Sequence, residues 1–518
     1  MAPKISVMIG SRRVRISPWV NSKFVPHTIT PLIEQVTPVK SAKPVLLLLT
    51  LFSLSFSVCL AENPKPEQPN ILFIFADDYS YDCVHATGNN EVMTPNIDSI
   101  ARQGTEFSRA YNMGGWNGAV CIASRTMLNT GRFIWTANNL DQKKERQANR
   151  FWSLQMKQAG YETYFTGKWH VKTKPNLIFD HVGSVRGGMP KQTPEGYNRP
   201  VEGQEDVWSP FDKSKGGFWQ GGKHWSEVVG DETVGFLDNA AQSEKPFFMY
   251  VAFNAPHDPR QSPKEFVDKY PLENISVPPN FLPEYPYKDA MGNSKKLRDE
   301  KLAPFPRTEY SVKVNRQEYY AIITHMDQQI GRILDHLKTI DKADNTYIVF
   351  TADHGLSVGH HGLIGKQNMY EHSVRVPFFI AGPDIPAGRT IENRIYLQDV
   401  VPTTMELATG KVPSFVKFKS LVPMIQSQIN EHYRSIYGGY INLQRMVIQD
   451  NMKLILYPEA KKIRLYNLEN DPLEMNDLAQ DPKFKQVIQD LFNELLELQK
   501  ETEDVLDLKE IFGHTVGI

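Results

Sequence analysis

The chain has 518 residues, more than a single typical core accommodates, so we expect one large domain joined to a smaller one. Its 58 basic and 59 acidic residues give a net charge of −1, which argues against a nucleic-acid-binding surface. Hydrophobic residues make up 41% of the chain, a typical fraction for a soluble globular protein.

Residues 1–61 contain an apolar run with the features of a signal peptide. The run from Val45 to Ala61 follows two lysines, ends at a small residue and precedes a polar stretch that begins at Glu62. This order predicts an exported protein, periplasmic or secreted, whose mature chain begins near Glu62. The alternative is an uncleaved membrane anchor, because the run approaches the length that spans a bilayer. Residues 1–44 show no clear periodicity and are grouped with the run as an N-terminal extension.

Predicted strands and helices alternate along the next part of the chain. Five segments predict strands: 70–75, 161–166, 246–252, 346–351 and 376–381. The first is apolar at successive positions, which is typical of a strand buried on both faces of a sheet. Helical patterns lie between or beside these segments, at 94–104, 151–160, 226–241, 319–337 and 399–407. The alternation predicts an α/β fold, with a large, mostly parallel sheet sandwiched by helices, in a catalytic domain of residues 66–410.

Two stretches of the predicted catalytic domain lack a periodic pattern. Residues 171–225 are dense in glycine, proline, lysine and aromatic residues, and 259–312 is rich in proline. We expect both to be surface loops that frame a substrate cleft. The pattern changes after residue 410, where a hairpin at 445–457, a strand at 464–468 and a helix at 481–506 predict a smaller antiparallel α+β domain, 411–518.

Acidic side chains follow two of the predicted strands. Asp77 and Asp78 come soon after the strand 70–75, and Asp353 and His354 follow the strand that ends at residue 351. In α/β proteins the carboxyl ends of the strands are where ligands bind. Adjacent carboxylates repel unless they share a cation, and hard oxygen ligands suit calcium or magnesium. Either pair alone is compatible with a solvated turn, but together they predict one site for a divalent cation.

Cys121 lies between a glycine-rich loop and two small residues, and Arg125 follows one helical turn later on the same face. If a helix starts here, its free N–H groups favour an anion such as sulfate. The structural alternatives are a buried apolar cysteine and a disulfide with Cys83. A disulfide would consume the thiol and exclude a chemical role.

The segment Cys121-Ile122-Ala123-Ser124-Arg125, together with the two strand-end pairs, resembles the sulfatases of the alkaline-phosphatase superfamily. In that family a maturation enzyme oxidises the cysteine of the motif C-x-P/A-x-R to Cα-formylglycine (3-oxoalanine), whose hydrated aldehyde is the nucleophile. The resemblance implies that Cys121 supplies the nucleophile and joins Asp77, Asp78, Asp353 and His354 around the metal. It also implies that Arg125 holds the nucleophile in place. It favours calcium, with magnesium possible. Ala123 stands where the family most often has proline.

Three further segments match the family in its order along the chain. Gly167-Lys168-Trp169-His170 implies that Lys168 contacts sulfate and His170 the nucleophile. Pro256-His257 makes His257 a candidate acid for the leaving oxygen. Gly365-Lys366 implies that Lys366 binds sulfate. His354, in place of the commoner asparagine, is similar to an iduronate-sulfatase-like subset, and as a less usual ligand for a hard cation it could instead touch the scissile oxygen. The histidines with no match are interpreted as pocket walls or surface: His360, His361 and His372.

The resemblance implies a sulfuric ester hydrolase that releases inorganic sulfate from a sulfated small molecule or glycan, and we expect sulfated saccharides. A phosphodiester or phosphonate monoester hydrolase of the same superfamily is an alternative. A protein of another class, a non-catalytic binder of sulfated glycans whose cysteine stays unmodified, is a second. No nucleic acid partner is expected, and a membrane is a partner only if the N-terminal segment is retained.

Overall fold

The computed structural model describes residues 68–517. The predicted extension and signal peptide, 1–61, lie outside the described residues. Within 68–517, no helix combines the length and the hydropathy that crossing a bilayer requires. The described residues belong to one compact unit that begins at Pro64.

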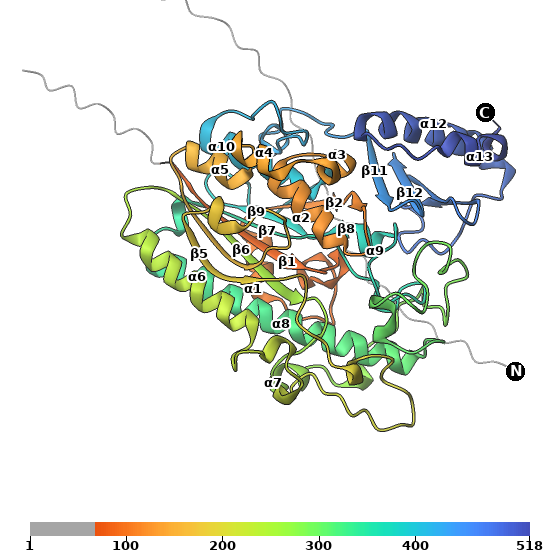
Figure 1. The fold of residues 1–518 in the computed structure, drawn as a ribbon, viewed down its shortest axis with the longest axis horizontal. Helices are drawn as coiled ribbons and strands as arrows, with labels where there is room; N and C mark the ends of the chain where they lie inside the picture. Colours follow the sequence, from red (N-terminus) through yellow and green to blue (C-terminus); the bar gives the residue numbers. More distant parts are fainter. Residues whose placement is uncertain (1–67, 518) are drawn as a thin grey trace, which may run out of the picture. The chain divides into compact units, whose positions relative to one another are not determined.

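A nine-stranded sheet forms the centre of this unit, in the order β10-β2-β9-β7-β1-β6-β4-β5, with β8 paired to β2 (Figure 1). The strands from β7 to β5 all run parallel, as does the pair β10 and β2, whereas β9 is antiparallel to both its neighbours. The bounds are β1 (Asn70–Asp77), β2 (Thr105–Tyr111), β4 (Glu162–Lys168), β5 (His181–Arg186), β6 (Phe247–Pro256), β7 (Thr346–Ala352), β8 (Arg375–Val376), β9 (Phe378–Ala381) and β10 (Arg389–Tyr396). The predicted large, mostly parallel sheet is confirmed.

Register within this sheet determines which strand ends meet. β1 and β6 are buried along their whole length, which accounts for their continuous apolar sequence. Ala76 at the end of β1 pairs with Ala352 of β7, and Asp77 pairs with Pro256 of β6. The residues that follow these three strands are therefore neighbours at one edge of the sheet.

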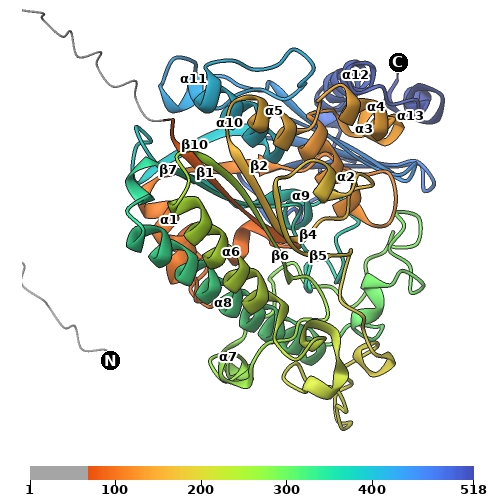
Figure 2. The same ribbon diagram turned by 60° about the vertical axis from the view of Figure 1, so that its left-hand side comes forward.

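Helices cover both faces of the sheet, as the sequence predicts (Figures 1 and 2). One face carries α1 (Pro95–Gln103), α6 (Trp225–Ala241) and α8 (Glu309–Thr339), and the other carries α2 (Val120–Thr130), α5 (Trp152–Gln158) and α10 (Val400–Thr409). Shorter helices are α3 (Ile134–Asn139), α4 (Gln142–Gln147), α7 (Lys264–Val267), α9 (Glu371–Val374) and α11 (Val422–Ile425). α8 begins ten residues before the predicted start at 319, at a capping box of Thr308 and Ser311.

A second, five-stranded sheet has the order β14-β13-β12-β11-β3. Its strands are β3 (Gly114–Gly115), β11 (Ser435–Tyr440), β12 (Gln444–Gln449), β13 (Met452–Tyr457) and β14 (Lys462–Asn467), and it packs against α12 (Lys485–Thr502), which α13 (Leu508–Val516) follows. The predicted hairpin is β12–β13. The predicted helix 481–506 is instead a short 3-10 turn followed by α12, which ends where Glu503 adopts a left-handed backbone.

One strand of the smaller sheet comes from far upstream. β3 precedes Cys121 and pairs in parallel with Gly439 and Tyr440 of β11. Gly114 has φ +96°, and a Cβ there would lie 2.1 Å from the carbonyl oxygen of Gly439, so only glycine fits. The loop that carries Cys121 is thereby anchored to the C-terminal sheet. The domain boundary at 410–411 stays a prediction.

The two stretches without a periodic pattern behave differently. The expectation of loops throughout 171–225 is wrong for His181–Arg186, which form the edge strand β5 beside β4. That strand is only partly buried and lacks a run of large apolar residues, which is why its sequence gives no strand signal. Residues 259–308 are mainly irregular, with α7 and two short 3-10 helices, of which one spans Asp299–Leu302, but the expectation of a loop is wrong for 309–312, which form the first turn of α8.

Candidate active site

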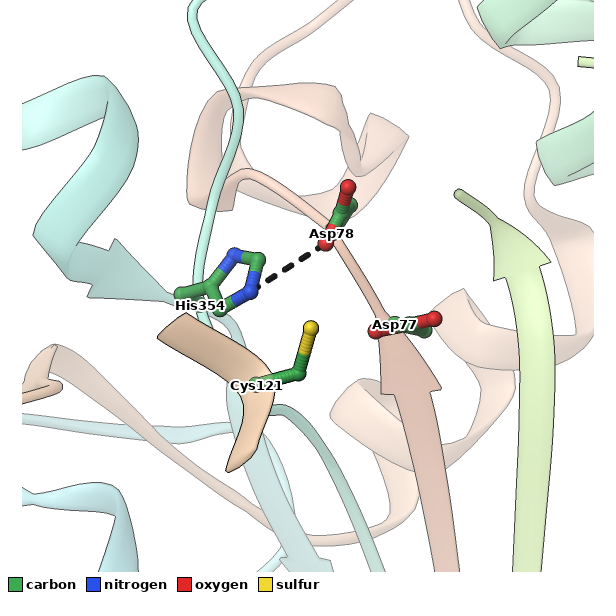
Figure 3. A group of neighbouring side chains, drawn as sticks. All are labelled: Asp77, Asp78, Cys121 and His354. Carbon is green, nitrogen blue, oxygen red and sulfur yellow. Dashed lines mark ion pairs between the residues drawn. The ribbon is translucent and has the colours of Figure 1, made fainter. Parts of the chain in front are cut away.

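Side chains from three strand ends and one helix converge at the carboxyl edge of the large sheet. Asp77 ends β1, Asp353 and His354 follow β7, Lys168 ends β4, and Cys121 lies in the first turn of α2. Figure 3 shows the side chains of Asp77, Asp78, Cys121 and His354 facing one another, and one ligand atom from each lies within 4.8 Å of the others. This group contains four of the five predicted metal-site residues, and Asp353 lies beside it through its contacts with Asp78 and His354; that they bind a metal stays a prediction.

Backbone hydrogen bonds tie the two acidic pairs together. Asp78 has φ +65°, a left-handed conformation that asparagine and aspartate tolerate better than most residues. Its N–H donates to Asp353 Oδ1 at 3.2 Å, and the N–H of Tyr79 donates to the carbonyl of His354 at 2.9 Å. The sharp turn after β1 therefore directs the Asp78 side chain across the end of β7.

Cys121 is 2% exposed and forms no disulfide, since both it and Cys83 are free thiols. The alternative of a Cys83–Cys121 bridge is therefore wrong. No side chain caps the start of α2, and although the N–H of Ile122 donates to the carbonyl of Ala119 at 3.0 Å, those of Val120 and Cys121 remain available to an anion. Burial opposes ionisation of the thiol, but Lys168 and Lys366, with hydrogen bonds from nearby histidines, outweigh it and hold the pKa of Cys121 well below its usual range.

Arg125 is fully buried and faces the acidic groups beneath Cys121. Its Nε donates to Asp353 Oδ2 at 3.0 Å and its Nη1 to the carbonyl of Lys168 at 2.8 Å. Its Nη2 lies 3.6 Å from Asp77 Oδ1, and neither of those two atoms has a hydrogen-bond partner among the described residues. Arg125 thus links the ends of β4 and β7 and carries the positive charge that balances two carboxylates.

Two lysines bring further positive charge to the same place. The ammonium group of Lys168 contacts Asp77. Lys366 Nζ lies 2.8 and 2.7 Å from the two carboxylate oxygens of Asp78 and 3.9 Å from Cys121 Sγ. Both lysines are buried, which strengthens their attraction for an anion.

Two histidines in the site are held in their protonated forms. Burial opposes protonation of His257, but Asp78 and Asp258 outweigh it and raise its pKa to about 10. Burial likewise opposes protonation of His354, whose pKa is raised to about 9 by Asp353 and Asp78. His257 Nε2 is 2.9 Å from Lys366 Nζ, and its Nδ1 is held by Asp258.

His170 also reaches Cys121, through a hydrogen bond that contributes to the lowered thiol pKa. Like Asp78 it has a left-handed backbone, and it is partly exposed, unlike the other predicted site residues.

The residues present fit a divalent cation. Asp77 Oδ1 and His354 Nε2 are buried polar atoms without a hydrogen-bond partner among the described residues, and such atoms are costly unless a ligand satisfies them. His354 Nδ1 donates to the carbonyl of Gly355 at 2.9 Å, which leaves Nε2 as the metal-facing nitrogen once its proton is displaced. Asp353 adjoins this group, with Oδ1 3.6 Å from His354 Nε2. Carboxylate oxygens are the donors that calcium and magnesium prefer.

The sequence reasoning missed the groups that support these side chains. Asp258, Asp299 and Gln367 surround His257 and Lys366, and none was singled out. Asp258 had a signal, because it directly follows His257. The unmatched histidines are buried: His360 and His372 line a cavity of about 520 Å³, and His361 lies 3.3 Å from His372. Their expected place in pocket walls is confirmed for that pair, whereas the expectation of a surface position is wrong.

Sequence comparisons agree with this geometry. A model of the family described as "Sulfatase" matches residues 69–411, and one described as "N-sulphoglucosamine sulphohydrolase, C-terminal" matches residues 359–501. The N-acetylglucosamine-6-O-sulfatase of Bacteroides thetaiotaomicron is 26% identical, with 91% of this chain and 94% of that protein covered. The arylsulfatase of Clostridium perfringens is 28% identical, with 81% of this chain and 92% of that protein covered.

The fold is shared with solved structures. One, described in complex with its substrate D-glucosamine-2-N,6-O-disulfate, matches with a TM-score of 0.67 and 23% identity over 86% of this chain and all of that one. The phosphonate monoester hydrolase of Agrobacterium radiobacter matches with a TM-score of 0.64 and 20% identity, covering 84% of this chain and 96% of that one. At these identities the likeness establishes the fold. Since the family match spans well over half of the chain and the relatives are named sulfatases, this protein belongs to the sulfatase family and is a sulfuric ester hydrolase.

Proposed function

We propose that this protein hydrolyses sulfate esters of saccharides with a formylglycine derived from Cys121 and one divalent cation, calcium by preference. The observation that carries the proposal is the convergence of the Cys121 thiol with Asp77, Asp78 and His354. Support for a saccharide comes from two similar proteins, the N-acetylglucosamine-6-O-sulfatase of Bacteroides thetaiotaomicron and the structure in complex with a glucosamine disulfate.

Each proposed group supplies one kind of chemistry. A formylglycine hydrate carries two hydroxyl groups, one to attack sulfur and one whose proton loss frees the sulfate, whereas a cysteine or serine would remain esterified. A divalent cation at Asp77, Asp78, Asp353 and His354 offsets negative charge on the sulfuryl oxygens.

The chain's own residues bind and orient the ester. Lys168 and Lys366 present ammonium groups, and the N-terminus of α2 presents N–H groups, to the sulfate oxygens. Arg125 holds the carboxylates beneath Cys121 in place through Asp353. His257, whose Nδ1 is engaged by Asp258, points Nε2 toward Lys366 and the Cys121 side of the site, where it would give a proton to the departing alcohol oxygen.

Export and maturation are part of the same proposal. The signal-like run at 45–61 supports a mature chain that begins near Glu62 in the periplasm or outside the cell. Cys121 requires a formylglycine-installing enzyme, and the His354 in place of asparagine supports a place in the iduronate-sulfatase-like subset.

A substrate panel tests the reaction. We expect hydrolysis of glucosamine sulfates and 4-nitrophenyl sulfate, with kcat/KM above that for matched phosphonate monoesters and phosphate diesters. A phosphonate monoester hydrolase is the second candidate, favoured by the fold shared with the Agrobacterium enzyme. A higher kcat/KM on the phosphonate monoester would select it instead.

Mass spectrometry of the Cys121 peptide tests the nucleophile. The purified active enzyme should show the mass loss that accompanies replacement of the thiol by an aldehyde oxygen. A Cys121→Ala variant, which cannot be converted, is the matched control and should be inactive. Full activity with an unmodified thiol would contradict the proposed mechanism.

A further inference from the structure

The orientation of His257 depends on a residue that takes no part in binding sulfate. His257 Nδ1 lies 2.8 Å from the carbonyl oxygen of Asp258 and 3.0 Å from its carboxylate Oδ1. These two acceptors fix the ring so that Nε2 faces Lys366 and the Cys121 side of the site. Asp258 is itself 3% exposed, so the placement of its carboxylate needs a partner.

That partner is Arg298, from the long irregular stretch 259–308. The Nη1 atom of Arg298 contacts Asp258 Oδ2, and its Nη2 lies 3.2 Å from Asp258 Oδ1. A guanidinium that binds both oxygens of a carboxylate restricts its rotation as well as its position. The side chain of Arg298 is 33% exposed, so it joins the protein surface to the buried pair beneath it.

The next two residues hold the opposite wall of the site. Asp299 accepts a hydrogen bond from Gln367 Nε2 at 2.7 Å and lies 3.8 Å from Lys366 Nζ. Glu300 accepts from the N–H groups of Ile364 at 3.1 Å and Gly365 at 2.9 Å. One short segment, 298–300, therefore contacts both Asp258, which orients His257, and the loop that carries Lys366.

We propose that Arg298 is a positioning residue for proton donation by His257, and that the segment 298–300 keeps His257 and Lys366 at a fixed separation. The proposal rests on the proposed function, because it takes His257 as the proton donor. As the bond between sulfur and the leaving oxygen breaks, its electron pair stays on that oxygen, which takes the Nε2 proton. A protein in which the His257 ring is rotated, so that Nε2 no longer points at the leaving oxygen, still folds, but its histidine donates the proton poorly.

The test uses two substrates that differ in their need for a proton. 4-Nitrophenyl sulfate releases a stable phenolate, whereas phenyl sulfate releases a far more basic one. Arg298→Gln should lower kcat for phenyl sulfate by about 100-fold and kcat for 4-nitrophenyl sulfate by less than about 5-fold, with KM little changed. Arg298→Lys keeps the positive charge but cannot bind both carboxylate oxygens of Asp258 at once. Its kcat for phenyl sulfate should lie between those of Arg298→Gln and the wild type.

The ratio of the two kcat values is measured on one preparation, so it does not depend on how much of the variant is folded. Arg332→Gln, which removes another partly exposed arginine that pairs with Asp231, is the matched control and should leave the ratio unchanged. His257→Gln should shift the ratio in the same direction, and adding Arg298→Gln to it should shift it no further.

Two results would overturn the inference in distinguishable ways. Equal losses on both substrates in Arg298→Gln, with a shifted ratio in His257→Gln, would show that Arg298 only supports the loop. An unshifted ratio in His257→Gln would remove the proton donor from the proposed function, and the role of Arg298 with it.

Discussion

Arg125 and Arg445 are both almost completely buried, yet their surroundings differ. In the C-terminal sheet, Arg445 Nε and Nη2 bind the two oxygens of Asp504 at 2.6 and 2.8 Å, and Nη1 donates to the carbonyls of Ile441 and Gln444. At the active site, Arg125 leaves Nη2 without a hydrogen-bond partner among the described residues. A complete buried ion pair stabilises a fold, whereas an incomplete one keeps binding capacity for a ligand at some cost in stability.

The largest effect that tests this difference between the two arginines is expected for Arg125→Lys. The lysine keeps a positive charge but cannot hold Asp353 and the Lys168 carbonyl together, so we expect kcat on a sulfate ester to fall by about 10³-fold. The free energy of unfolding should change less than in the corresponding Arg445 variant. Steady-state kinetics and urea unfolding measure the two quantities, and a large stability loss with near-normal kcat would reverse the assignment.

Arg445→Lys should give the opposite result. It breaks the paired contact with Asp504 in a buried place, and we expect unfolding to become easier by about 3 kcal/mol. Since Arg445 supports the C-terminal sheet, kcat per folded molecule should stay at the wild-type value. Urea unfolding with active-site titration checks this, and a kcat loss comparable with that of Arg125→Lys would contradict it.

Removal of calcium should affect stability through the active site and not through the C-terminal sheet, and this is the next largest expected effect. At about 100 times its Kd, a cation bound at the acidic cluster adds about 2.7 kcal/mol to stability, so chelation should lower the melting temperature. Asp78→Asn, which removes one proposed ligand, should abolish the response, whereas Arg445→Lys should keep it. Calorimetry with and without a chelator supplies the measurement, and an unchanged melting temperature in the wild type would count against a tightly bound cation.

His361, which lies outside the active-site cluster, has its pKa shifted in the opposite direction from those of His257 and His354, and this gives the smallest predicted effect. Burial lowers the pKa of His361 to about 3, so the unfolded chain binds a proton before the folded protein does. Its neutral form costs nothing above pH 6.5, and stability is lost as pH falls from there toward 3, by about 2 kcal/mol at pH 5. His361→Gln should flatten the pH dependence of urea unfolding between pH 7.5 and 5, and an unchanged slope would contradict this origin.

The sequence predicts the central strands and the site they carry because a strand buried on both faces must be apolar throughout, and its polar successor then marks the sheet edge. Asp77, Asp78, Asp353 and His354 are found in this way. Edge strand β5 could not be predicted in this way, because a half-buried strand does not need a continuous run of apolar residues. Contacts between distant residues, such as Arg298 with Asp258, escape it as well, because nothing in the local pattern of either residue names the other.

The pairing of Gly114–Gly115 with β11 sets an order of events for the growing polypeptide. The loop ahead of Cys121 finds its neighbouring strand only after the ribosome has passed Tyr440. Until then the cysteine stays outside the finished interior. An enzyme that installs the proposed formylglycine would therefore have to reach Cys121 before the smaller sheet closes.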